Sequence, residues 1–129
     1  MTKKRILIVD DVEALRKQAI YSLAIIYPNV SFIEASNGFE ALDKVIKHKP
    51  DLILLDIDMP KMNGIDVLKR IRRSKDKKIK KLPIIMFTGT VDKDTVEDIV
   101  QLGVSGYLVK PFEIDALLEK VDTFLNTNE

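Results

Sequence analysis

Carboxylates stand at the ends of two apolar runs. Asp10 and Asp11 follow Ile6–Val9, and Asp56 follows Leu52–Leu55. Carboxylates that converge repel one another and raise each other's pKa unless a cation lies among them. Oxygen ligands without histidine or cysteine suit Mg²⁺, which binds through one or two carboxylates and completes its shell with water and phosphate oxygens. The sequence therefore predicts a Mg²⁺ site that can handle a phosphoryl group.

A cation, a hydroxyl group and a glycine end two further runs. Thr88 and Gly89 follow Ile84–Phe87, and Lys110 follows Val104–Val109. Lys110 offers a positive charge, Thr88 offers a hydroxyl donor, and Gly89 leaves room because it has no side chain. Phosphoryl transfer is catalysed mainly by positioning and by neutralising negative charge, so these residue types complete the predicted site.

Strands and helices are predicted to alternate along the chain. The apolar runs are continuous, which is typical of strands buried on both faces of a parallel sheet, and a weaker run spans Val30–Ile33. Apolar residues with helical spacing follow each run, within Leu15–Ile26, Ala41–Ile46, Ile65–Ile71, Val96–Val100 and Ile114–Leu125. A fivefold alternation in 129 residues predicts one doubly wound α/β domain, with its ligand site at the carboxyl ends of the strands.

Capping and turn residues agree with these boundaries. Asn37 with Glu40 three residues later predicts a helix start with a reciprocal cap. Gly103 is placed as a helix C-cap, and Pro50 and Pro83 precede predicted strands.

The composition excludes several classes of protein. It is ordinary for a globular domain, with 46% apolar and 32% charged residues. The absence of cysteine rules out disulfides and thiolate metal sites. No apolar stretch approaches the ~20 residues of a membrane helix, and the run behind the basic start is too short for a signal peptide. We expect a cytoplasmic protein with no membrane partner.

The basic residues are concentrated in Lys69–Lys81, which holds nine lysines and arginines and one acid. Such a block can be a nucleic-acid patch. No aromatic or glycine residue is interleaved with it, however, as single-strand binding would favour. We interpret it as a solvated helix end and loop, and we predict no direct nucleic-acid binding by this domain.

The motifs together resemble the receiver domains of two-component response regulators, in particular single-domain, chemotaxis-regulator-like ones. The resemblance rests on Asp10-Asp11, Leu54–Pro60 with Asn63-Gly64, Thr88-Gly89, and Tyr107–Phe112. It spans the whole chain. It implies a flavodoxin-like fold, with a five-stranded parallel sheet in the order 2-1-3-4-5 and five helices. We expect residues 1–129 to form one receiver (phosphoacceptor) domain, with no output domain in this chain.

The resemblance implies a role for each acidic residue. Asp56 would accept a phosphoryl group from the phosphohistidine of a sensor histidine kinase or a phosphotransfer protein. Asp11 and Asp56 would bind Mg²⁺ through their side chains, Asp58 through its backbone carbonyl, and Asp10 through ordered water. The protein would be a signalling phosphoacceptor and not an enzyme, catalysing only its own phosphoryl transfer and autodephosphorylation.

Four other groups would bind the phosphoryl oxygens, namely the Lys110 ammonium, the Thr88 hydroxyl and the backbone N–H groups of Ile57 and Gly89. The resemblance also implies a cis Lys110–Pro111 bond. We expect Thr88 to move toward the phosphoryl group and Tyr107 to turn inward from an exposed position. This switch would reshape the face formed by Lys93–Leu102, Val104–Val109 and Phe112–Leu125. The face should bind a basic downstream partner through its acids, with Asp94, Glu97, Asp98, Glu113, Glu119 and Asp122 as candidates.

Some residues have more than one interpretation. Asp58 is either a loop residue whose carbonyl reaches the metal or a side chain that also tunes the lifetime of the phosphoryl group. We interpret His48 as a surface histidine with no switching role. Met59 and Met62 are interpreted as packing residues.

Three other functions fit the sequence less well than a receiver does. The segment Leu52–Asp58 is similar to the motif of a haloacid-dehalogenase-type phosphatase, but that motif should begin the chain and be followed by Gly or Thr, whereas Met59-Pro60 follows here. A flavodoxin-like cofactor binder, which the same architecture permits, needs a phosphate loop where Asp10-Asp11 stands. A degenerate receiver that serves only as a scaffold is disfavoured because no site position is replaced.

Overall fold

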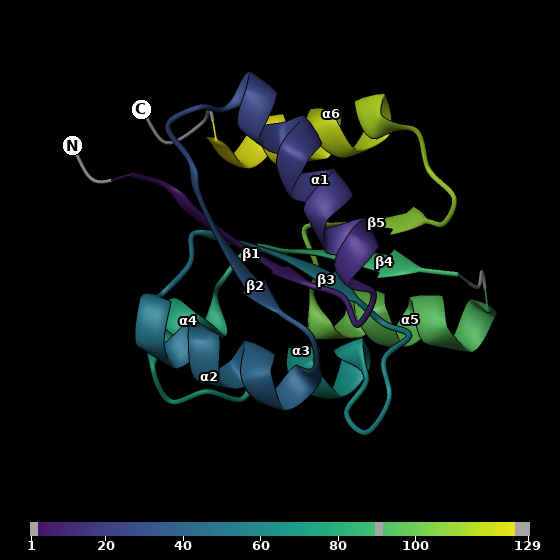
Figure 1. Cartoon of the computed structure of the whole chain (residues 1–129). Coiled ribbons are helices and arrows are strands. Elements are labelled where there is room, and N and C mark those ends of the chain that lie inside the picture. Colours follow the sequence, from purple (N-terminus) through teal and green to yellow (C-terminus); the bar gives the residue numbers. More distant parts are fainter. Residues whose placement is uncertain (1–2, 90–91, 126–129) are drawn as a thin grey trace.

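The computed structural model describes residues 3–89 and 92–125. Its strands form one parallel sheet in the order β2-β1-β3-β4-β5 (Figure 1), which confirms the expected order. The strands span β1 Arg5–Val9, β2 Ser31–Ala35, β3 Leu52–Asp56, β4 Ile84–Thr88 and β5 Gly106–Val109. All neighbouring strands pair in parallel, so their carboxyl ends lie along the same edge of the sheet.

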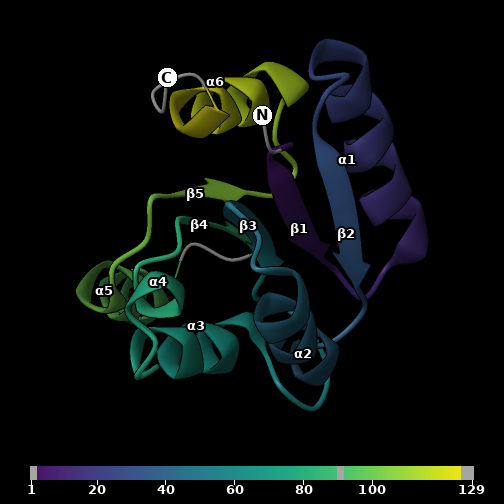
Figure 2. The same ribbon diagram turned by 90° about the vertical axis from the view of Figure 1, so that its left-hand side faces the viewer.

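Helices cover both faces of the sheet. Figure 2 shows one group of helices on one face and a second group on the opposite face. The first group is α1 Glu13–Ile26 and α6 Ile114–Leu125, and the second is α2 Gly38–His48, α3 Gly64–Arg72, α4 Lys77–Lys80 and α5 Lys93–Leu102. A separate apolar cluster fills the space on each face. No helix within the described residues is long and apolar enough to cross a membrane.

The central strands are buried on both faces. Every residue of β3 and β4 is buried, as are four of the five residues of β1. The edge strands β2 and β5 are mostly half-buried. Continuous apolar runs therefore mark the centre of the sheet, as predicted, because strands covered by helices on both sides have no face for polar residues.

Two predicted caps are present. The Asn37 side chain accepts a hydrogen bond of 2.9 Å from the Glu40 N–H at the start of α2. The reciprocal bond is replaced, since the Glu40 carboxylate pairs with the Ser36 hydroxyl at 3.3 Å. Gly103 ends α5 with a φ of 88°, and its N–H donates to the carbonyls of Ile99 and Val100.

Two elements differ from the prediction. The described residues contain a sixth helix, the single turn α4, within the basic run, because Asp76 accepts bonds from the N–H groups of Lys78 and Ile79. The fifth strand begins at Gly106 rather than Val104. Ser105 instead anchors the start of β4: its N–H donates to the Ile84 carbonyl, and its hydroxyl accepts from the Ile84 N–H.

Candidate functional site

Three buried polar side chains end the central strands at one edge of the sheet. Asp10 directly follows β1, Asp56 is the last residue of β3, and Thr88 is the last residue of β4. They are 5%, 2% and 1% exposed, respectively. Polar side chains are rarely this buried without a partner or a function, so the edge of the sheet where they meet is the candidate site.

The site holds a cluster of carboxylates. One carboxylate oxygen from each of Asp10, Asp11 and Asp56 can be chosen so that all three lie within 4.8 Å of one another. Asp11 is exposed and the other two are buried. An oxygen-only set that is open to solvent on one side fits a hard divalent ion that keeps several waters, so the chemistry of the donors suits Mg²⁺.

Lys110 brings a cation to the same carboxylates. Its Nζ lies 3.2 Å from Oδ1 of Asp56 and 3.4 Å from Oδ2 of Asp10. The Lys110–Pro111 bond is cis, as the resemblance implies, and the Lys110 N–H donates to the Thr88 carbonyl at 2.7 Å. Burial lowers the pKa of Lys110, but the charges of Asp56 and Asp10 outweigh burial and hold that pKa above its usual value.

The surroundings of Asp56 disfavour the charged form of its carboxyl group. Burial raises the pKa of Asp56 above its ordinary value, and the nearby charge of Asp10 adds to the increase. Lys110 and the Asp58 N–H act in the opposite direction without cancelling it. Additional positive charge at the site would therefore be stabilising, which agrees with a metal among the carboxylates.

Asp10 is held in place by the start of α1. Its Oδ1 accepts a 2.9 Å bond from the Val12 N–H. The Arg16 guanidinium donates to the Asp10 carbonyl at 2.7 Å and pairs with Glu34 at 3.0 Å. Arg16 is a positioning residue that the sequence did not reveal, because its partners come from two different strands or their ends.

The backbone amides differ from the expectation at one position. The Ile57 N–H donates to the Phe87 carbonyl at 2.9 Å. It therefore extends the pairing of β3 with β4 in this structure, and its binding to phosphoryl oxygens stays a prediction. The amide that faces the site is that of Asp58, whose N–H lies 3.2 Å from Oδ1 of Asp56. The Gly89 N–H does face the site, where it donates to Oδ2 of Asp58 at 2.9 Å.

Thr88 and Tyr107 lie on neighbouring strands. Thr88 is opposite Val109 in the β4–β5 pairing, and Tyr107 is opposite Met86, two residues further back. Tyr107 is half-buried and packs against the apolar cluster beneath α2, α3 and α5. It is less exposed than expected for the inactive position. The predicted movement of the two side chains stays a prediction.

The acidic face lies around β5, at an edge of the sheet between α5 and α6 (Figure 2). The six candidate acids are exposed. One of them, Asp122, accepts a 2.9 Å hydrogen bond from the Tyr27 hydroxyl near the end of α1. Burial, together with this carboxylate, raises the pKa of Tyr27 to about 12. Asp122 therefore faces α1, whereas Asp94, Glu97 and Asp98 lie on α5.

Three residues outside the carboxylate cluster were expected to have no role in the chemistry, and two of them lie in the core. Met59 and Met62 are 8% and 4% exposed and belong to the apolar core, which confirms that they are packing residues. His48 is half-buried rather than fully exposed. Its carbonyl accepts a 2.8 Å bond from the Arg5 guanidinium.

Comparisons with known proteins agree with this geometry. Residues 6–122 match the family model of the response regulator receiver domain. The chain is 39% identical to chemotaxis protein CheY-3 of Vibrio cholerae over 92% of its own length and 88% of the relative's. It is 34% identical to sporulation initiation phosphotransferase F of Bacillus subtilis, over 97% and 96% of the two chains.

Solved structures show the same relationship. The structure of Vibrio cholerae chemotaxis protein CheY4 superposes with a TM-score of 0.84 at 30% identity, and the match covers 96% of this chain and all of that one. Sequence, fold and the aspartate cluster all lead to one assignment. The chain belongs to the family of response regulator receiver domains, and it is a phosphorylation-activated signalling switch.

Proposed function

We propose that Asp56 is the residue that accepts the phosphoryl group. The observation that carries this proposal is its position: a buried carboxylate that meets Lys110, Asp10 and the Asp58 N–H at one point. An oxygen of Asp56 forms the new bond to phosphorus as the bond from phosphorus to the donor nitrogen breaks, and the imidazole keeps that electron pair. Lys110, Thr88 and the amides of Asp58 and Gly89 then stabilise the negative charge.

We also propose Mg²⁺ as the metal of this site. The side chains of Asp11 and Asp56 and the backbone carbonyl of Asp58 would hold it directly, and Asp10 would act through water. The ion supplies positive charge for the transferred phosphoryl oxygens. The domain is a signalling phosphoacceptor that catalyses only its own phosphorylation and autodephosphorylation.

Asp58 is proposed to affect the lifetime of the acyl phosphate. Its Oδ2 accepts a hydrogen bond of 2.9 Å from the Gly89 N–H. This N–H is one of the amides proposed to bind the phosphoryl oxygens. The carboxylate and the phosphoryl group therefore compete for one donor. This contact favours the second interpretation of Asp58, in which the side chain itself tunes the site.

The phosphodonor is proposed to be a sensor histidine kinase or a phosphotransfer protein. Either donor would contact the surface beside α1. A groove of about 510 Å³ runs between α1 and α6 and includes Asp10 and Lys110 in its lining. Leu15 and Ile114 also line it and are 43% and 41% exposed. An apolar rim beside the site suits a protein donor.

The basic partner on the acidic face, and the cytoplasmic location, stay predictions.

Intact-mass spectrometry after incubation with acetyl phosphate and Mg²⁺ tests the assignment. One phosphoryl adduct is expected in the wild type and none in Asp56→Asn, with Asp43→Asn, an exposed aspartate on α2, as the control. An adduct of wild-type yield in Asp56→Asn would reject Asp56. Leu15→Asp should retain labelling by acetyl phosphate and lose transfer from a phosphorylated phosphotransfer domain.

A further inference from the structure

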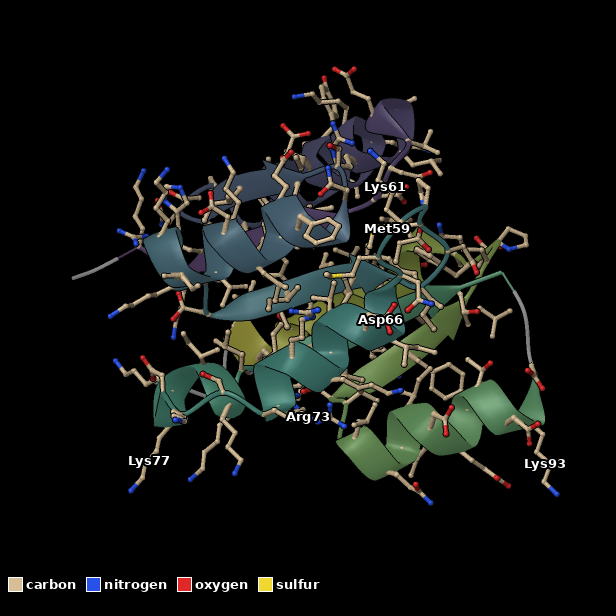
Figure 3. All side chains as sticks on the ribbon, turned by 90° about the horizontal axis from the view of Figure 1, so that it is seen from below. Met59, Lys61, Asp66, Arg73, Lys77 and Lys93 are labelled. Carbon is tan, nitrogen blue, oxygen red and sulfur yellow. The ribbon has the colours of Figure 1, made fainter. Side chains whose placement is uncertain are left out.

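We propose that a basic groove between α2 and α3 binds an acidic segment of a partner protein, one with an apolar residue among its carboxylates. The groove has a volume of about 430 Å³. It is lined by Phe39, Lys61, Met62, Asp66, Lys69, Arg70 and Arg73. Figure 3 looks onto this side of the molecule, with Lys61 in the loop after β3, Asp66 on α3 and Arg73 at the end of that helix.

One wall of the groove is a straight row of charges. Lys69, Arg70 and Arg73 come three, four and seven residues after Asp66. This helical spacing places all four on one side of α3 and its C-cap, Arg73. At 1.5 Å per residue the row is about 10 Å long. The three cations of the row lie within its last four residue steps, about 6 Å, and Lys61 adds a fourth positive charge from the loop after β3. Several separate positive charges along one groove match carboxylates repeated along a chain better than they match a single phosphate ion.

The groove cations are available for a partner. Within residues 3–89 and 92–125, no salt bridge joins Lys61, Lys69, Arg70 or Arg73 to a carboxylate. Arg72, from the same basic run, is different: it donates to the carbonyls of Lys80 and Gly103 at 2.9 Å each. Burial lowers the pKa of Arg72. The run therefore separates into a structural arginine and cations that line a groove.

The opposite wall offers an apolar contact. Phe39, near the start of α2, is 58% exposed, whereas Met62 is almost fully buried and lies beneath the groove. A Cβ on Gly38 would lie only 2.8 Å from the Met62 side chain, so α2 packs closely on this methionine. Exposed aromatics beside arginines are typical of protein interfaces. Phe39 is thus placed to cover an apolar residue of the bound segment.

The lining favours a peptide over a nucleic acid. Asp66 repels phosphates and carboxylates alike, but a peptide backbone also has N–H groups that can donate hydrogen bonds to the Asp66 carboxylate, and a nucleic-acid backbone has none. Phe39 is a single aromatic, and stacking on successive bases needs several. The lysines of α4, which would extend a track for a nucleic-acid backbone, do not line the groove.

Fluorescence anisotropy with a labelled peptide tests the proposal. The probe is a run of glutamates interrupted by one leucine and one phenylalanine, and the control peptide has glutamine at every glutamate. The Arg70→Glu, Arg73→Glu double variant should lose at least about tenfold in affinity, which is 1.4 kcal/mol. The matched Lys77→Glu, Lys78→Glu variant changes the net charge equally on α4 and should stay within about twofold.

The apolar contact has its own control. Phe39→Ala should weaken binding several-fold, whereas Ile46→Ala, on the same helix and 67% exposed, should not. Circular dichroism checks that every variant folds, and Arg70→Gln replaces the double variant if that one does not. Three results would overturn the proposal: no binding by the wild type, equal losses in the groove and α4 variants, or tight duplex DNA binding at physiological salt through the groove arginines.

Discussion

The α-carbon of Gly64 lies against the backbone carbonyl of Asp56, and a side chain on Gly64 would overlap the carbonyl oxygen. The Gly64 N–H also donates to the Ile57 carbonyl at 3.0 Å. These contacts fold the loop between β3 and α3 back onto the end of β3. They fix the position of the backbone at Asp56, the proposed phosphoacceptor.

Gly64→Ala is therefore expected to destabilise the domain. Forcing a methyl group into a packed site costs about 1–3 kcal/mol, and here the neighbouring atoms are backbone atoms that cannot turn aside. Urea denaturation measures the change. Gly89→Ala is the control, since the one described neighbour that a Cβ there would meet is the Asp58 carboxylate, at 3.4 Å. Equal stability of Gly64→Ala and wild type would show that the loop adjusts freely.

Lys110→Met should also lower the free energy of unfolding, because Asp56 and Asp10 would lose the cation between them. Leaving a buried charged group without its partner costs about 1–3 kcal/mol or more. The exposed Lys93→Met variant on α5 should change little. The comparison is made at neutral pH without divalent ions, and an unchanged Lys110→Met would mean that water already screens the carboxylates.

Asp56→Asn should be more stable than the wild type at neutral pH in the absence of metal. The pKa of Asp56 is raised in the folded state, mainly by burial, so folding favours the protonated form. That contribution is complete below the unfolded pKa and is lost as the pH rises through the folded value. Asparagine resembles the protonated form at every pH.

Denaturation curves measured in EDTA across the acid range check this sign. The advantage of Asp56→Asn should shrink as the pH falls toward the ordinary Asp56 pKa of 3.8 and below it. An advantage that grows with acidity would contradict the raised pKa.

Mg²⁺ should stabilise the unphosphorylated domain, because it binds only the folded arrangement of carboxylates. A hundredfold excess over Kd adds about 2.7 kcal/mol. Asp11→Asn should lose most of this increase, while Asp43→Asn on α2 should keep it. Melting temperatures with and without MgCl₂ give the measurement, and an equal response in Asp11→Asn would exclude Asp11 as a ligand.

Beryllofluoride, a phosphoryl mimic, should shift amide NMR signals from Asp56 through Thr88 and Tyr107 into the acidic face. Moving a switch from 1:99 to 99:1 takes about 5.5 kcal/mol, which a few charge-assisted hydrogen bonds can supply. Thr88→Ala should confine most shifts to the site. Transmission as strong in that variant as in the wild type would refute this route.

Much of the fold and the site could be predicted from the sequence because the residues that can do chemistry stand at the ends of the strands. Asp10, Asp56, Thr88 and Lys110 each end or follow an apolar run. In a parallel sheet, residues at these ends meet at one edge. No knowledge of side-chain geometry was needed to bring them together.

Other features depend on pairing that no local pattern encodes. The Ile57 N–H bonds to the Phe87 carbonyl, one residue beyond the end of β3. The amide that contacts Asp56 is therefore that of the next residue, Asp58. Arg16 has one partner on β2 and one in the residue that follows β1. The turn α4 forms because Asp76 caps it inside the basic run.

The order of the strands also matters while the chain is being made. Strands β1, β2 and β3 are adjacent in the sheet and precede β4 and β5 in the chain, so a growing polypeptide can assemble them first. Asp10 and Asp56 then meet before Lys110 has been synthesised, and the edge of β3 is still unpaired. The edge of β3 is paired only after β4 has been made, and Lys110 can neutralise the two carboxylates only after β5 has been made.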